Sequence, residues 1–247
     1  MRNSDCTNGS YFHLDCLGLK RKPNNYKKLW LCSVCKVSSF NQTVDQDVQD
    51  ELIFSGLSYN QDVNRYPQWM NLTDEHFAII NSKTGWLDDE IINNAQFLIK
   101  QCNPLISGLQ HTALGPCNNF TIMTCEFIQI LHTGNNHWVC VSSIGSGPGE
   151  VNLYDSLFSK VSEDLRRQIK CLIGDDLLHH INIMTVQQQQ NGYDCGLFAI
   201  AFATCLAFHI SLENAEFDCI QMCNHLNKYL LDGNIEPFPL IFLQNLT

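Results

Sequence analysis

Charged residues are scarce in this 247-residue chain, and the basic ones are outnumbered by the acidic ones. There are 15 Lys and Arg against 25 Asp and Glu, a formal net charge of -10, which argues against a nucleic-acid-binding surface over the whole chain. No apolar run approaches the ~20 residues that cross a bilayer, so we expect no membrane span. The first ten residues are polar, which predicts that no secretory signal peptide is present.

The chain has ample material for a folded core. Hydrophobic residues make up 45% and aromatic residues 10%, which excludes wholesale disorder. The length suits one enzyme-sized domain with a small additional segment. Without a signal peptide, the 13 cysteines predict an intracellular protein of the nucleus or cytoplasm, in which they are buried thiols, metal ligands or a nucleophile.

Composition divides the chain into three regions. Residues 1–36 contain cysteines and a basic stretch, and residues 37–68 are polar and acidic, which indicates a linker. Residues 69–247 alternate apolar segments of helical and strand period, which predicts a mixed α+β domain rather than a regular βαβ series. The predicted elements are helices after Asp88 or Asp89, after Ser162, over 196–210 and over 213–231, and strands over 121–132, 138–143, 151–155 and 181–186.

The stretch Gln187–Ile200, with the sequence QQQQNGYDCGLFAI, carries the strongest candidate nucleophile. Cys195 precedes the predicted helix 196–210, which is apolar on all sides and therefore expected in the core. The positive end of a helix dipole favours a thiolate. Gln189 is placed to point its amide NH2 at an oxyanion, and Gly196 to leave room beside the sulfur. A core cysteine after a turn is the alternative.

A base for this thiol is predicted at the start of a strand. His137 begins one predicted strand and Asp155 ends the next, and a hairpin of this length brings two such residues side by side. An imidazole held by a carboxylate is the pair that activates a nucleophile. His179 and His180 are rival bases, but no carboxylate is placed to orient them, so we interpret them as surface residues.

Four short motifs follow one another along the large region. They are Gly85–Asn93 (GWLDDEIIN), His137–Trp138, Tyr154–Ser156 and Gln189–Gly196 (QQNGYDCG). Their order and spacing resemble the ubiquitin-like protease family, the SUMO-deconjugating cysteine proteases. The resemblance implies a papain-like α+β fold and cleavage after the terminal Gly-Gly of a ubiquitin-like modifier.

The resemblance also implies a role for each residue of the predicted catalytic set. Cys195 is the nucleophile and His137 is the general base. Asp155 is the orienting partner of that base, and Gln189 is the oxyanion donor.

Two tryptophans match positions that form a narrow tunnel over the modifier's glycines in this family. They are Trp86 and Trp138, and two indole faces enclose a Gly-Gly segment and exclude residues with a Cβ. Asp89 matches a position that contacts the modifier. Core packing is the alternative role for the tryptophans, and helix capping is the alternative for Asp89.

The chain departs from the family pattern in two places. Asp88 stands where asparagine is usual, and the loop 101–119 matches nothing specific. Because surface loops select the modifier in such enzymes, SUMO and a related modifier both stay open. Two other functions also stay open, namely a catalytically idle chromatin adaptor and an acyltransferase that uses the same triad.

The amino-terminal region has the spacing of zinc ligands. His13 and Cys16 are followed by Cys32 and Cys35, and two residues separate the members of each pair. The segment around the first pair resembles the second half of a PHD finger, which implies zinc and a histone-tail partner. Only Cys6 lies upstream to complete a site, so the finger is incomplete, degenerate or a vestigial segment that binds no metal.

Overall fold

The computed structural model describes residues 72–82, 84–157 and 160–241. They belong to one structural unit, which begins at Met70. The predicted regions 1–36 and 37–68 lie outside the described residues. Across the part of the chain that is described, no helix is both long and apolar enough to cross a membrane.

One five-stranded mixed sheet runs through the domain in the order β1-β2-β3-β4-β5. The middle strands β2, β3 and β4 pair antiparallel, while β1 and β5 lie parallel to their neighbours at the two edges. A mixed sheet of this kind confirms the predicted α+β class. The strands are β1 Ser107–Gly108, β2 Phe127–His132, β3 Trp138–Ser142, β4 Glu150–Tyr154 and β5 His180–Ile183.

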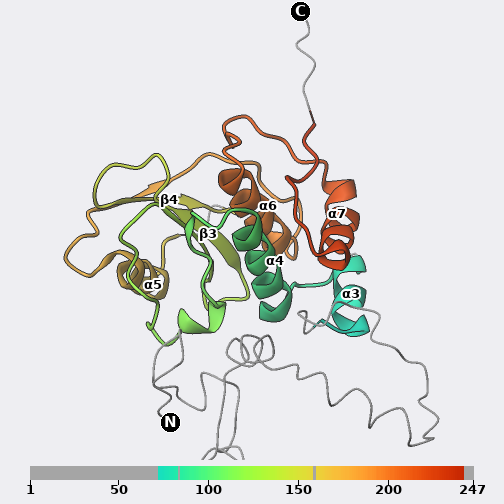
Figure 1. The fold of residues 1–247 in the computed structure, drawn as a ribbon, viewed down its shortest axis with the longest axis horizontal. Helices are drawn as coiled ribbons and strands as arrows, with labels where there is room; N and C mark the ends of the chain where they lie inside the picture. The colour runs from blue at the N-terminus through green and yellow to red at the C-terminus, as the bar shows by residue number, and fades with distance from the viewer. Residues whose placement is uncertain (1–71, 83, 158–159, 242–247) are drawn as a thin grey trace, which may run out of the picture. The chain divides into compact units, whose positions relative to one another are not determined.

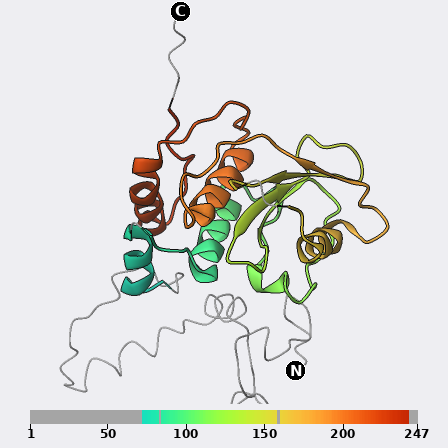
Figure 2. The same ribbon diagram turned by 180° about the vertical axis from the view of Figure 1, so that it is seen from behind.

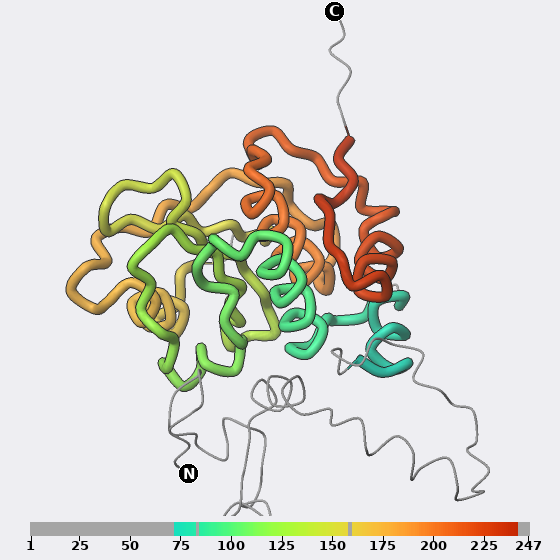
Figure 3. The backbone as a smooth tube through the Cα atoms, in the orientation of Figure 1, coloured from blue at the N-terminus to red at the C-terminus, as the bar shows by residue number. Residues whose placement is uncertain are grey.

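Helices cover both faces of the sheet. Figure 1 and the reverse view in Figure 2 show α5 on one side of the sheet and α4 with α6 on the other. Figure 3 shows α3 beside α7, although the two helices lie at opposite ends of the described sequence. The helices are α3 Asp74–Asn81, α4 Asp89–Cys102, α5 Glu163–Ile173, α6 Cys195–Ala207 and α7 Cys219–Asp232, with a 3-10 turn, η3, at Thr112–Leu114.

Helix α6 is buried along its whole length, as its continuous apolar sequence predicts. It packs against β2 and β3 of the sheet and against α4 and α7, so it has no solvent face. Phe198 and Phe202 form an aromatic cluster with Phe217, and Tyr154 of β4 contacts Phe202 across the sheet face. The first residue of this helix, Cys195, is therefore held by a large packed core.

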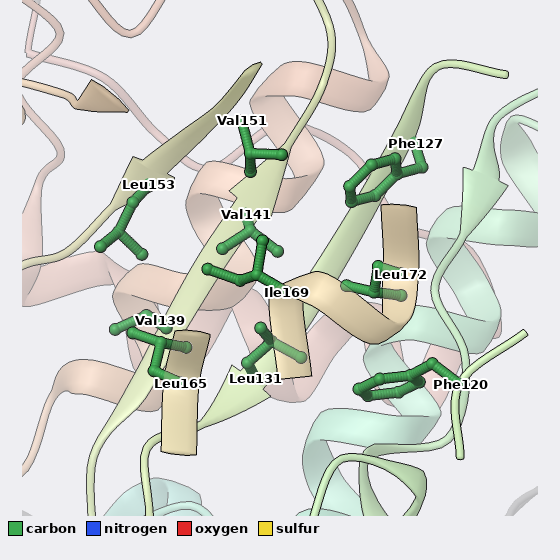
Figure 4. Packing of buried hydrophobic residues seen from close by; sticks show 10 residues of the cluster. All are labelled: Phe120, Phe127, Leu131, Val139, Val141, Val151, Leu153, Leu165, Ile169 and Leu172. Atoms are coloured by element: carbon green, nitrogen blue, oxygen red, sulfur yellow. The ribbon is translucent and has the colours of Figure 1, made fainter. Parts of the chain in front are cut away.

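Helix α5 covers the opposite face of the sheet with one apolar stripe (Figure 4). Ser162 caps the helix by accepting a hydrogen bond from the backbone N–H of Leu165 at 3.1 Å. This confirms the helix start that the sequence predicts. The buried cluster on this face comprises Phe120, Phe127, Leu131, Val139, Val141, Val151, Leu153, Leu165, Ile169 and Leu172.

The strand predicted over 121–132 is shorter in the structure and begins only at Phe127. Upstream of it, the backbone N–H of Met123 donates to the carbonyl of Leu172 at 2.7 Å. The chain there bonds to the end of α5 instead of to a neighbouring strand. The alternating pattern alone does not distinguish these two partners.

The last helix also begins later than the predicted range 213–231. Asp218 caps α7 by accepting from the backbone N–H of Ile220, so the helix begins at Cys219. The preceding residue, Phe217, forms an isolated antiparallel bridge with Leu240. This bridge keeps the segment before the cap extended.

Candidate active site

Helix α4 begins at one side of the candidate site. Asp88 is its N-cap, and the Asp88 Oδ1 atom accepts from the backbone N–H of Ile91 at 3.0 Å. Asp89 is the first helical residue and is exposed. The sequence offered both aspartates as the cap, and the structure assigns capping to Asp88, which leaves the Asp89 carboxylate facing outward. The apolar face of α4 that the sequence predicts is fully buried and comprises Ile91, Ile92, Ala95, Leu98 and Ile99.

A tight turn between β2 and β3 places His137. The backbone N–H of Thr133 donates to the His137 carbonyl at 2.9 Å and closes the turn. Gly134 and Asn136 both adopt left-handed backbone conformations, with φ of 87° and 52°. Glycine and asparagine tolerate this region best, so the sequence TGNN before the histidine fits the turn that it forms.

The structure brings His137 and Asp155 together, as the hairpin argument predicts. His137 Nε2 lies 2.7 Å from Asp155 Oδ1, and both side chains are buried. The same oxygen of Asp155 accepts from the backbone N–H of Leu157 at 2.8 Å. The carboxylate is thereby fixed from two sides and holds the imidazole in one orientation.

The protonation of His137 follows from its two partners. Burial lowers its pKa, but the hydrogen bond with Asp155 and the nearby Cys195 outweigh burial and raise the pKa from 6.5 to about 9. The imidazole is therefore protonated near neutral pH. A nearby histidine, His132, behaves differently, because burial and the His137 charge both lower its pKa.

Cys195 is buried and is the first residue of α6. The N-cap residue Asp194 makes no side-chain capping bond, and its Oδ2 atom accepts instead from Asn191 Nδ2 at 2.6 Å. The N–H groups at this helix start are therefore not capped by that side chain. Burial raises the pKa of two other buried cysteines, Cys140 and Cys205, that of Cys205 to about 12.

Gln189 lies on the loop before α6 and is buried. Its Oε1 atom accepts from the Ser156 hydroxyl at 2.6 Å, and its Nε2 atom donates to the Asn191 carbonyl at 2.6 Å. An amide NH2 carries two N–H donors, so the Asn191 carbonyl occupies one of them and the second is available to a ligand.

A cavity of about 410 Å³ lies over Cys195, and Trp86, Asp89 and Trp138 line it together with this cysteine. Trp86 is 48% exposed, whereas Trp138 is 8% exposed and donates from Nε1 to the Leu87 carbonyl at 2.9 Å. The structure thus brings the two predicted tunnel tryptophans to one cavity. Trp138 also packs in the interior, as the alternative role predicts, and its role in a substrate tunnel stays a prediction.

Sequence reasoning missed several residues that line this cavity. His132 lies directly opposite Trp138 in the β2–β3 register, and their rings are 4.7 Å apart. His132 comes just before the turn that leads to His137 and Trp138. The register of the predicted hairpin was the signal that could have placed it beside Trp138. The other residues missed are Thr112, Ala113, Pro116 and Asn136.

Buried and half-buried amides hold the loop 101–119, which matched no family motif. Asn93 Oδ1 accepts from the backbone N–H of Thr112 at 2.9 Å, and Gln129 Oε1 accepts from that of Gln110 at 2.7 Å. Gln129 Nε2 also donates to Gln96 Oε1 at 3.0 Å. Polar residues on the buried side of α4 were the available signal, because buried amides need partners.

Gly196 has a packing role that the sequence did not predict. A Cβ at this position would lie 2.9 Å from the Leu87 Cβ, so glycine is required for the close approach of the Trp86 motif to α6. The predicted room beside the Cys195 sulfur stays a prediction. The close approach matters because it sets Leu87, and with it Trp86, beside Cys195.

The predicted surface histidines and the predicted zinc ligands have separate outcomes. His179 and His180 are both exposed, which confirms their interpretation as surface residues. The zinc ligand candidates His13, Cys16, Cys32, Cys35 and Cys6 lie outside the described residues. Within the ranges that are described, no cluster of His, Cys, Asp and Glu has the arrangement of a metal site.

The helix that begins at a cysteine and the histidine-carboxylate pair are the parts that a cysteine-peptidase site requires. Residues 118–230 match the family described as "Ulp1 protease family, C-terminal catalytic domain". This stretch is therefore similar to the Ulp1-type catalytic domain, and the matched family is one of cysteine peptidases. No curated protein matches the chain.

Solved structures show the same fold. One is the C-terminal Ulp1 protease domain in complex with Smt3, the yeast ortholog of SUMO, which is 17% identical with a TM-score of 0.51. The match covers 68% of this chain and 86% of that one. Another is the SUMO protease Ulp1 with its catalytic cysteine oxidized to a sulfinic acid, also 17% identical with a TM-score of 0.51, covering 77% and 97%.

Proposed function

We propose that this protein is a cysteine peptidase that cleaves after the terminal Gly-Gly of a ubiquitin-like modifier, SUMO or a related one. The observation that carries the proposal is the 2.7 Å pair of His137 and Asp155 beside Cys195, a cysteine that lines a cavity together with two tryptophans. The Ulp1-type domain and the Smt3 complex of a similar structure support a modifier as the partner.

The proposed reaction begins with a thiolate at Cys195. The Cys195 thiol gives its proton to His137, whose raised pKa favours the imidazolium, and Asp155 stabilises this charge. The sulfur attacks the carbonyl carbon of the terminal glycine and forms a C–S bond. As the C–N bond breaks, the imidazolium gives its proton to the leaving amine, and the acyl group stays on the sulfur as a thioester.

Water completes the cycle. The now neutral His137 takes a proton from the attacking water, the C–S bond breaks, and the modifier leaves with a free carboxyl group. In both steps the carbonyl oxygen becomes an oxyanion. The free N–H of Gln189 and the uncapped backbone N–H groups at the start of α6 are the donors that stabilise it.

The proposed specificity for Gly-Gly follows from the lining of the cavity. Trp86 and Trp138 both line it. A peptide without Cβ atoms passes between two indole faces, whereas residues with larger side chains are excluded. Asp89 is exposed at the same cavity and is the proposed contact to the folded part of the modifier. The predicted zinc finger and its histone-tail partner stay predictions.

The test is covalent labelling with modifier probes that carry a propargylamide at the terminal glycine. SUMO and ubiquitin probes are compared on the full chain, and adducts are mapped by mass spectrometry. We expect one modifier to label Cys195 and Cys195→Ser to lose the adduct, while Cys205→Ser on the same helix retains it. Labelling of another cysteine, or no labelling by any modifier, would overturn the proposal.

A further inference from the structure

Ser156 is a buried polar residue that the proposed mechanism leaves without a role. It follows Asp155 directly and is 1% exposed. Its hydroxyl donates to Gln189 Oε1 at 2.6 Å, across 33 residues of sequence. Gln189 supplies the side-chain donor of the proposed oxyanion hole, so the partner of its amide oxygen bears on catalysis.

The two ends of a glutamine amide have opposite chemistry, because only the nitrogen end donates to an oxyanion. The Ser156 hydroxyl fixes the oxygen end, and the Asn191 carbonyl accepts from the nitrogen end at 2.6 Å. If the amide turned over, Gln189 Oε1 would face the Asn191 carbonyl, and two acceptors would meet without a proton between them. The two contacts together select one orientation.

The backbone strengthens this connection. The Gln189 N–H donates to the Ser156 carbonyl at 3.0 Å, and Gln188 Nε2 donates to the Asp155 carbonyl at 3.0 Å. Because the Asp155 side chain holds His137, the short segment after β4 contacts both halves of the catalytic set. One side orients the imidazole, and the other orients the amide.

We infer that Ser156 is a positioning residue for the oxyanion hole and acts through Gln189. The inference rests on the proposed function and adds to it the group that orients the side-chain donor. Loss of an oxyanion donor costs roughly 10²–10³-fold in kcat. Loss of the group that orients this donor should cost less, about tenfold, because the Asn191 contact still holds the nitrogen end.

The experiment separates oxyanion stabilisation from thiol reactivity in Ser156→Ala. Hydrolysis of the aminomethylcoumarin amide of the modifier that labels Cys195 forms an oxyanion, whereas alkylation of Cys195 by iodoacetamide forms none. We expect kcat to fall about tenfold with KM within about twofold, and the alkylation rate of Cys195 to stay within about twofold. Ser156→Thr, which keeps the hydroxyl, should recover part of the lost kcat.

Two further variants complete the design. In a Gln189→Ala background, Ser156→Ala should cause no additional loss of kcat, because the two residues act as one unit. Ser142→Ala is the matched control, since Ser142 is equally buried and its hydroxyl donates to the Phe127 carbonyl at 2.8 Å within the sheet. Its kcat should equal that of the wild type.

The outcomes distinguish the two proposals. An active wild type with an unchanged kcat in Ser156→Ala would overturn this inference and leave the proposed function standing. Equal losses of kcat and of Cys195 alkylation would also overturn it, because they indicate general disruption of the site. An inactive wild type would overturn both proposals. If Ser156→Ala does not fold, Ser156→Cys, a near-isosteric and weaker donor, replaces it with the same expectations.

Discussion

The two faces of the sheet are built in different ways. On one face, α5 contributes a single apolar stripe to a cluster that contains no candidate catalytic residue (Figure 4). On the other face, α6 is buried on all sides and begins at Cys195, and this face also carries Trp138. Both faces are well packed, yet only the second face carries a candidate catalytic residue, Cys195.

The difference lies in what surrounds each helix. Because α5 has a solvent face, its packing can relax without moving the site. Because α6 lies between the sheet, α4 and α7, the position of its first residue is set by every layer around it. Variants on the α5 face should therefore change stability alone, and variants that reach the start of α6 or the cavity beside it should change catalysis.

The largest expected effect is the loss of His137. His137→Gln removes both the proton acceptor and the partner of Asp155, so kcat/KM should fall at least ~10³-fold. Steady-state hydrolysis of the modifier substrate measures this fall. His179→Gln is the matched control, because His179 is exposed, and its kcat/KM should stay at the wild-type value. A residual rate within tenfold of wild type would exclude His137 as the base.

The next largest expected effect is the loss of stability when a substitution creates a cavity beneath α5. Ile169 is fully buried in the cluster beneath α5, so Ile169→Ala should cost about 2–5 kcal/mol of unfolding free energy. The kcat of the folded fraction should not change. Urea unfolding and single-temperature kinetics on one preparation measure the two quantities. Leu177→Ala removes a 58% exposed side chain and should cost far less. A large fall in kcat would mean that the two faces are coupled.

Trp86 provides a sharper contrast on the cavity side, because it is 48% exposed. Trp86→Ala should lower kcat/KM by roughly 10²-fold through looser placement of the substrate, with an unfolding free energy within about 1 kcal/mol of wild type. Trp138→Ala should lose both activity and stability, since Trp138 is buried and bonded to Leu87. If Trp86→Ala retains full activity, the substrate passes elsewhere.

The pKa of His137, about 9, predicts the alkaline limit of activity. The imidazolium protonates the leaving amine, so kcat/KM should fall about tenfold for each pH unit above this value. The folded-state pKa lies above the ordinary 6.5, so the associated stabilisation is fully present below pH 6.5 and is lost as pH rises through about 9. The Tm difference between wild type and His137→Gln should shrink accordingly. A flat rate to pH 10 would contradict this assignment.

Local patterns in the sequence predicted α4, α5, α6 and α7 and the His137–Asp155 pairing, but not the short helix α3. The apolar stripe of α5, its Ser162 cap and the all-apolar run of α6 are each visible within one segment. The hairpin argument succeeded because two adjacent strands need only a short turn to meet.

Contacts between distant segments were not predictable in the same way. Gln96 and Gln129 meet across 33 residues and hold a loop at the cavity, and Ser156 meets Gln189 across the same separation. Side-chain amides and hydroxyls have no periodic signature, so their partners become visible only in the folded chain.

The smallest expected effect comes from loss of the Ser162 cap of α5, on the sheet face whose cluster contains no candidate catalytic residue. Ser162 Oγ accepts from the backbone N–H of Leu165, and Ser162→Ala leaves this donor without its partner, at a cost of about 1 kcal/mol. For a domain of this size the Tm should fall by about 2–4 °C. Ser162→Asp keeps an acceptor at the helix start and should restore the Tm, while kcat/KM stays constant in both variants. A fall in kcat/KM that Ser162→Asp reverses would show that α5 influences the site, because only the cap differs between these proteins.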